Sequence, residues 1–533
     1  MRKATSPWLV LVCLVLGFFM ILLDTTIVNI AIPSMIDGLH ASLDQILWVI
    51  NAYVLVYAVL LITAGRLGDL FGPKRLFLAG MLVFTLASAA CGLAGSPGWL
   101  IGARVAQGVG GALLTPQTLS LITHIFPAEK RGAAFGIWGA VAGLAAISGP
   151  TLGGFIVTHW GWQWIFYVNV PIGVVGLAMG LAFVPDLRPG RHHRLDLTGT
   201  ALATIGLFGI TFGLIEGEKY RWNAAIWATL AAGVAVLGVF LVTQYRNRAE
   251  PLVPFEVFAD RNFALMSYVA AAIGFAMFGM FVPLVIFLQS VLGLDALRAG
   301  LTLAPMSVVS MVVAPFAGRL ADRYGGKYIL VTGLSLFTAG MALVLAAAKV
   351  TAGRWDFLPG LVVAGLGLGC TFAPMTTVAM RNIGPRMAGA ASGVFNTTRQ
   401  LGMVIGSAAV GALLQNQLVS KLTAAAQAQA AALDSRQRAV FVDNFTHAAS
   451  HLQVGTGQSG VKLPPGTPQP VKDAAVRAFH EGYVNAMRPT LVLPIVVLAS
   501  AVLCCLAIKR RDRTGAATRE PVASPPAASR SSG

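Results

Sequence analysis

The chain has 533 residues, of which 56% are hydrophobic and only 11% carry a charged side chain. Soluble domains carry roughly 25% charged residues, so this composition excludes a soluble protein and predicts a chain that crosses a membrane many times. The formal net charge of +17 would suit a nucleic-acid-binding protein, but the positions of the charges, given below, argue against that class.

Fourteen apolar stretches are long enough to cross a bilayer, which takes about 20 residues. They span approximately 8–32, 45–64, 76–95, 98–121, 133–157, 164–184, 197–215, 224–244, 263–289, 299–317, 328–348, 357–379, 389–416 and 489–508. We therefore expect an all-α polytopic membrane protein. The first stretch follows two basic residues, but it is too long for a signal peptide and carries an acid where a cleavage site would lie, so we interpret it as the first membrane helix.

That acid, Asp24, lies about two-thirds of the way along the first span. A carboxylate in hydrocarbon costs at least ~2.5–3.5 kcal/mol, and such groups usually face a bundle interior or a water-filled cavity. Of the 21 Asp and Glu residues, only Asp24 lies well inside a span, and Glu216 and Glu218 at the end of the seventh span are the nearest rivals. Asp24 is therefore a candidate proton site. The alternative is an acid neutralised by a neighbouring helix for packing alone.

A loop sequence occurs twice. The segment from Gly65 to Lys74 follows the second span and returns 253 residues later as the segment from Gly318 to Lys327. Repeated halves are typical of transporters. Because an Asp at a helix end can bind a neighbouring helix in one conformation and release it in another, each loop is a candidate latch. The alternative is a basic loop that only sets topology. The latch residues that we expect are Gly65, Asp69, Gly72, Lys74, Arg75, Asp322 and Arg323.

Arg104 lies in the fourth span, which is otherwise apolar, and a buried guanidinium needs an acceptor. If it lies near Asp24, a proton on that acid would change the charge balance between the two helices. The competing interpretation is that Arg104 reaches out to the membrane interface.

The fifth span contains Ser-Gly-Pro-Thr-Leu-Gly-Gly from Ser148 to Gly154. Its proline breaks the backbone hydrogen-bond ladder and its glycines permit close helix approach, so Gly149, Pro150, Gly153 and Gly154 are predicted to form a hinge and seal between the two halves. Ordinary small-residue packing without movement is the alternative.

The thirteenth span places polar groups in the membrane at Asn396 and Arg399. These side chains are predicted either to line a central cavity or to hydrogen-bond neighbouring helices. Asn29 and Glu216 complete the set of cavity candidates.

The basic residues set the orientation. With the N-terminus inside, the cytoplasmic segments hold 24 of the 38 Lys and Arg residues, and five lie in the short outer loops. Positive charge is retained on the cytoplasmic side of membrane proteins, so both termini are expected there. The basic composition is thus a topology signal, and no nucleic-acid partner is expected.

We expect four regions. Residues 1–190 form an N-terminal six-helix half and residues 191–250 an inserted helix pair. Residues 251–508 form a C-terminal six-helix half with an outer loop at 417–488. Residues 509–533, rich in Ala, Ser and Pro, are a disordered cytoplasmic tail.

Several motifs together resemble the fourteen-helix drug:proton antiporter branch of the major facilitator superfamily, the EmrB/QacA-like exporters. They are the segments from Leu23 to Pro33, from Gly65 to Arg75, from Arg104 to Gly110 and from Ser148 to Gly154. The resemblance implies the major facilitator fold, proton coupling that involves the fourth-helix motif, and antiport associated with the fifth-helix motif. Ala145, where the family often has Gly, is a small departure.

The sequence therefore predicts a proton-coupled exporter of amphipathic, often cationic compounds in the cell membrane. Its partners would be a small substrate, protons, the lipid bilayer and an outer-side partner of loop 417–488. The alternative is a dedicated exporter of a lipid, a siderophore or a self-made antibiotic on the same fold. An enzyme is disfavoured because no phosphate-binding loop, nucleophile motif or metal-ligand spacing is found, and no cofactor beyond the proton gradient is expected.

Overall fold

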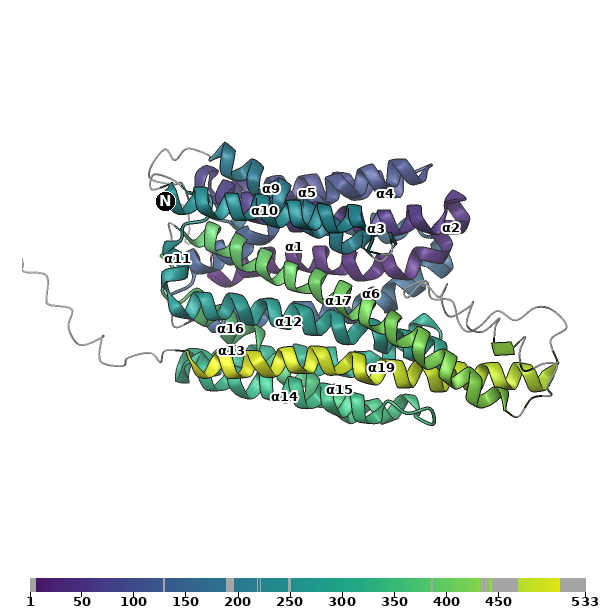
Figure 1. Cartoon of the computed structure of the whole chain (residues 1–533). Helices are drawn as coiled ribbons and strands as arrows, with labels where there is room; N and C mark the ends of the chain where they lie inside the picture. Colours follow the sequence, from purple (N-terminus) through teal and green to yellow (C-terminus); the bar gives the residue numbers. More distant parts are fainter. Residues whose placement is uncertain are drawn as a thin grey trace, which may run out of the picture.

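The computed structural model describes residues 6–127, 130–187, 196–217, 219–220, 222–247, 251–384, 387–431, 433, 438, 441–442 and 468–508. The elements of this part of the chain are all helices, and most run side by side in one bundle (Figure 1). We call the end of the bundle at which α1 begins and α19 stops the near end; it lies at the left in Figure 1. The opposite end is the far end.

The first half of the chain contributes six long helical segments. They are α1 (Pro7–Ile27) with η1 (Val28–Ala31) and α2 (Ile32–Leu39), α3 (Leu43–Phe71), α4 (Pro73–Gly92), α5 (Pro97–Ile125), α6 (Arg131–Trp160), and α7 (Trp164–Tyr167) with α8 (Asn169–Phe183). Helix starts follow local capping rules. Ser42 and Gln45 form a capping box at α3, and Ser96 caps α5 directly before Pro97.

Two helices, α9 (Leu197–Glu216) and α10 (Ala224–Arg246), follow as a pair. Asp196 holds the pair together because it caps α9 at Gly199 N (2.7 Å) and accepts from Gln244 Nε2 of α10 (2.6 Å). In turn, α9 packs on α3 and α17. The pair predicted as an insertion is therefore attached to the side of the bundle.

The second half repeats the pattern. It contains α11 (Glu256–Ala259), α12 (Arg261–Ile286), η3 (Phe287–Val291), α13 (Ala296–Tyr324), α14 (Gly326–Ala347), η4 (Arg354–Phe357), α15 (Leu358–Gly369), α16 (Phe372–Ala379), α17 (Ala388–Ala430) and α19 (Gln469–Leu506). The main contacts between the halves are α6 on α13 and α3 on α17.

Twelve helical segments of the described chain are long and apolar enough to cross a membrane. The two remaining predicted spans coincide with α5 and α6, whose 29 and 30 residues include many glycines and polar groups. The outside of the bundle carries large exposed apolar side chains, such as Val174, Val234, Val312 and Val496. Such a surface suits lipid and would be a liability in water.

Two helices project beyond the far end (Figure 1). With 43 and 38 residues, α17 and α19 are about 65 and 57 Å long, roughly twice the ~30 Å of a bilayer core. Residues 417–430 and 469–488 of the predicted outer loop at 417–488 continue these two helices. Most of the segment between them, and the predicted disordered tail at 509–533, lie outside the described residues.

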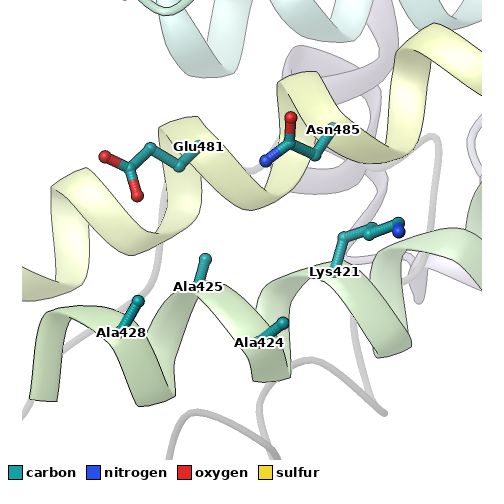
Figure 2. Close-up of a pocket in the computed structure, with 6 residues that line it drawn as sticks. All are labelled: Lys421, Ala424, Ala425, Ala428, Glu481 and Asn485. Carbon is teal, nitrogen blue, oxygen red and sulfur yellow. The ribbon is translucent and has the colours of Figure 1, made fainter.

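The projecting parts of α17 and α19 pack against each other, and we call them the arm. Gln429 Nε2 donates to both carboxylate oxygens of Glu481 (3.2 Å each). Figure 2 shows a shallow pocket between the two helices of the arm. It is lined by Lys421, Ala424, Ala425, Ala428, Glu481 and Asn485.

Candidate functional site

Asp24 and Arg104 form an ion pair in the interior of the first half. Arg104 Nη1 lies 2.5 Å from Asp24 Oδ2, and the two side chains are 1% and 0% exposed. The contact that the sequence left open is thus present, and Arg104 does not reach out to the interface. The pair lies one helical turn before α1 changes to the 3₁₀ turn η1, a kind of irregularity that often marks a functional hinge.

Further donors surround the carboxylate. Gln107 Nε2 donates to Asp24 Oδ1 (2.9 Å), and Asn169 Nδ2 donates to the same oxygen (3.3 Å). Both amides also donate to Ser88 Oγ, at 3.2 and 3.1 Å. Asp24 therefore accepts hydrogen bonds from three side chains, Arg104 and Gln107 on α5 and Asn169 on α8.

Arg104 is fixed on its other side by α3. Its Nε donates to the carbonyl oxygen of Val49 (3.0 Å), and its guanidinium carbon lies 4.2 Å from the centre of the Tyr53 ring. Tyr53 stacks on Tyr57 one turn further along α3 (5.9 Å between centroids). A proton on Asp24 would remove the charge that balances Arg104, and five helices would experience the change.

A second constellation joins the two halves at the near end. Asp69, at the end of α3, accepts from Gly389 N (2.9 Å) and Ala390 N (2.8 Å), which begin α17. The first N–H groups of a helix have no partner within it and carry partial positive charge, so a carboxylate there is well placed.

The repeated loop makes the symmetric contact. Asp322, at the end of α13, accepts from Gly132 N (2.7 Å) and Ala133 N (2.9 Å), which begin α6. Each half therefore holds a helix start of the other half through its own Asp. The paired contacts join the two halves at the near end of the bundle.

Glycines permit this close approach. A Cβ at Gly65 would lie 2.5 Å from the Gly389 oxygen and 3.0 Å from Gly393 Cα, both backbone atoms that cannot swing away. Gly72 and Gly325 end α3 and α13 with φ of 93° and 86°, which other residues rarely adopt. The repeated turns thus have a shared backbone reason.

The basic residues of the two loops divide into two kinds. Lys74 Nζ donates to Val184 O (2.6 Å) after α8, and Lys327 Nζ donates to Leu506 O (2.6 Å) in the last turn of α19. Each lysine thus satisfies carbonyls where the last helix of its own half ends. Arg75 and Arg323 are exposed, and Arg323 lies over the Tyr324 ring. The described hydrogen bonds between the halves at this end do not include either arginine.

The glycine motif of α6 packs inside the first half. A Cβ at Gly149 would lie 2.6 Å from Thr26 Cβ, and one at Gly153 would lie 2.8 Å from Ile27 Cγ1, both next to Asp24 on α1. Gly154 has no atom within 4 Å of such a Cβ, and Pro150 lies in the helix. The glycines that meet the other half come earlier in α6, at positions such as Gly136 and Gly143. A hinge at Gly149 therefore stays a prediction, while its contacts differ from the seal that we expected between the halves.

The cavity candidates separate in the structure. Asn29 is exposed on η1, and its Nδ2 donates to Thr25 O (3.0 Å). Glu216 is 4% exposed at the far end of α9, with Lys219 Nζ at 3.9 Å. Asn396 and Arg399 lie on α17, and Asn396 Nδ2 donates to Ser392 O (2.9 Å).

Gln107, Asn169 and Ser88 were not singled out from the sequence, although Gln107 lies in a quoted motif. The available signal was an amide or hydroxyl inside an apolar span, because polar side chains there serve as contacts between helices. Within the described residues, no group of three or more His, Cys, Asp and Glu side chains could hold a metal ion.

Comparisons with known proteins agree with this architecture. The family model described as Major Facilitator Superfamily matches residues 14–407. An uncharacterized MFS-type transporter of Mycobacterium tuberculosis is 44% identical over 417 residues, which cover 78% of this chain and 72% of that protein. The multidrug resistance protein Stp of the same species is 35% identical and is covered to 77%, with 78% of this chain aligned.

The probable actinorhodin transporter of Streptomyces coelicolor is 36% identical over 413 residues, 76% of this chain and 72% of that protein. The solved structure of the proton:xylose symporter XylE has a TM-score of 0.56 at 12% identity, with 93% of this chain and 95% of that chain covered, which shows a shared fold. The chain therefore belongs to the Major Facilitator Superfamily, among its membrane-spanning transporters of the multidrug and antibiotic-resistance type.

Proposed function

We propose that this protein is a secondary active exporter that moves small amphipathic compounds out of the cell in exchange for protons. The observation that carries the proposal is the buried Asp24–Arg104 pair with its amide donors. A carboxylate inside a membrane span is costly in free energy, which favours a functional role for it. A proton on Asp24 would also remove the charge that balances Arg104.

The paired Asp contacts supply the conformational part of the proposal. Asp69 and Asp322 close the near end by binding helix starts in the opposite half, so export would require both contacts to break when cargo enters there. Basic residues of the sequence concentrate at this end, which supports placing it in the cytoplasm with both termini. The state described here would then be closed to the cytoplasm.

The finer architecture is also part of the proposal. Since α5 and α6 pack along the other spans and carry the buried partners of Asp24 and Asp322, we place them across the membrane too, which makes fourteen spans. This count and the motifs in α1, α5 and α6 support the EmrB/QacA-like drug:proton antiporter branch. The cell membrane is the proposed location, and the proton gradient is the proposed energy source, without a bound cofactor.

A second candidate is a dedicated exporter of one natural product on the same fold. The relative named probable actinorhodin transporter favours it, because that name describes a single cargo. Asp24 would couple protons in either case, so the two candidates differ only in the breadth of the cargo.

The deciding experiment uses everted vesicles with an imposed pH gradient and a panel of fluorescent dyes. Uptake should depend on the gradient in the wild type and be lost in Asp24→Asn at equal protein level. Asp37→Asn, an exposed acid on α2, is the matched control and should behave as the wild type. Undiminished gradient-driven uptake in Asp24→Asn would refute the proposal.

A further inference from the structure

Arg399 places a guanidinium at mid-depth between the two halves. It lies 11 residues after the start of α17, about 17 Å from the near end and so close to the centre of a ~30 Å bilayer core. The helix that carries it, α17, packs along α3 of the other half. This layer lies six residues along α17 from Gly393, where the two halves approach closely at Gly65.

The guanidinium is poorly satisfied. Among the described residues, its buried Nε has no hydrogen-bond partner, and its Nη2 reaches only Asn396 Oδ1 at a long 3.4 Å. No ion pair of the described chain includes Arg399. Arg399 is half-buried, and a charge inside a membrane span with no counter-ion and only one long hydrogen bond is costly, so its position requires an explanation.

The neighbouring charges do not provide a counter-ion. Asp24 is the one acid deep within a described span, and its oxygens already accept from Arg104, Gln107 and Asn169. The Asp24–Arg104 pair is neutral, so Arg399 leaves the centre of the described bundle with one net positive charge. Protonation of Asp24 would raise it to two.

We propose that Arg399 binds an anionic group, such as a carboxylate or a phenolate, on the exported compound. The proposal rests on the proposed export function and specifies its cargo class. It replaces the cationic cargo expected from the sequence, because a cation at this layer would meet Arg399 and no unoccupied carboxylate among the described residues. Asn396 Oδ1 accepts from Nη2 at one edge of the guanidinium.

The charge of the cargo has an energetic consequence. If one proton enters for each anion that leaves, two positive charges move inward per cycle, so an inside-negative potential accelerates export. Exchange of one proton for one monovalent cation moves no net charge. Electrical dependence of transport thus separates the two cargo classes.

The test compares two dyes built on the same ring system, anionic carboxyfluorescein and cationic tetramethylrhodamine methyl ester. Purified wild-type protein should gain thermal stability with the anion and not with the cation, because a ligand that binds the folded state stabilises it. Arg399→Gln should lose the shift and bind the anion about tenfold more weakly or worse, since a hydrogen bond to a charged group is lost. Arg399→Lys should retain part of the shift, and Arg319→Gln, an exposed arginine at the near end, should retain all of it.

Arg399→Gln is expected to fold at least as well as the wild type, because it removes a half-buried charge that has no counter-ion among the described residues. Absence of an anion-specific shift in the wild type, or its survival in Arg399→Gln, overturns the proposal. Asp24→Asn separates it from the proton-coupling proposal: the anion shift should persist while gradient-driven transport disappears. Gradient-driven transport that survives in Asp24→Asn, together with an Arg399-dependent shift, would refute proton coupling at Asp24 alone.

Discussion

Asp24 and Arg104 depend on each other at the residue scale. Each is buried, each has the other as its counter-charge, and removal of one partner from a buried pair costs about 3–5 kcal/mol. We expect Asp24→Asn and Arg104→Gln to lower the thermal stability of the purified protein. The double variant should recover part of that loss, because no uncompensated charge remains. Thermal unfolding in detergent measures all three.

A transport assay distinguishes proton coupling by the Asp24–Arg104 pair from a role of the pair in helix packing alone. If the pair only holds helices together, the double variant should regain proton-driven uptake along with its stability. We expect it to stay inactive, because no group remains to carry the proton. Recovered uptake would assign the pair to packing.

Part of this site could be predicted from the sequence. The cost of an acid in an apolar span made Asp24 stand out, and the same argument singled out Arg104. It did not reach Asn169 or Ser88, because an amide or a hydroxyl in a span costs far less than a charge and is common at helix contacts. Their roles depend on which helices meet, and periodicity within one span does not encode that.

At the scale of the element, the two repeated loops hold the halves together through Asp69 and Asp322. Asp69→Asn keeps one acceptor but loses the charge that attracts the start of α17. We expect the near end to open more often, by about tenfold for each ~1.4 kcal/mol lost. Ser392→Cys reports this opening, since Ser392 is fully buried and donates to Pro116 O across the halves. Its labelling by an impermeant maleimide should rise in a background that lacks the five native cysteines.

The repeat offers its own controls for this prediction. Asp322→Asn should have the same effect from the other side, whereas Asp260→Asn should have none. Asp260 also caps a helix, but it caps α12 at Phe263 N (2.8 Å) within its own half. Equal labelling in all three variants would show that the Asp69 and Asp322 contacts do not govern opening of the near end.

The glycine motif of α6 makes a separate prediction. Gly149→Ala pushes a methyl group against Thr26 Cβ, and overpacking of this kind costs about 1–3 kcal/mol. Because Thr26 lies two residues after Asp24, we expect reduced uptake as well as a lower unfolding temperature. Gly154→Ala, in the same motif but in open space, is the matched control. Normal uptake in Gly149→Ala would remove the motif from the transport cycle.

At the scale of the whole molecule, the sequence predicted more of the fold than of its contacts. Apolar length located a helix at every predicted span, and the loop repeat indicated two related halves. That α17 continues from the span into the arm without a break could not be predicted, because the polar, Ala-rich sequence after residue 416 has no apolar stretch to show it. Cross-half contacts such as Asp69–Gly389 join residues 320 positions apart and could not be read from local pattern.

The arm allows a final test, of whether transport by the helix bundle depends on the projecting parts of α17 and α19. We propose to replace residues 424–480 with a short Gly-Ser linker, a cut that keeps Leu422 packed on Gly482 and the Tyr483 hydroxyl bonded to Pro283 O (2.9 Å). None of the described contacts of Asp24, Asp69 or Asp322 involves the arm. Dye uptake in vesicles should therefore stay within about twofold of the wild type, as for other changes away from buried features.

Whole cells add the second half of that experiment. If the arm binds an outer-side partner, as the sequence led us to expect, the shortened protein should transport in vesicles and fail to export from intact cells. If both assays remain normal, the arm recruits nothing that export requires. Loss of vesicle uptake at a normal protein level would instead place the arm in the transport path, and the division between transport core and arm would be wrong.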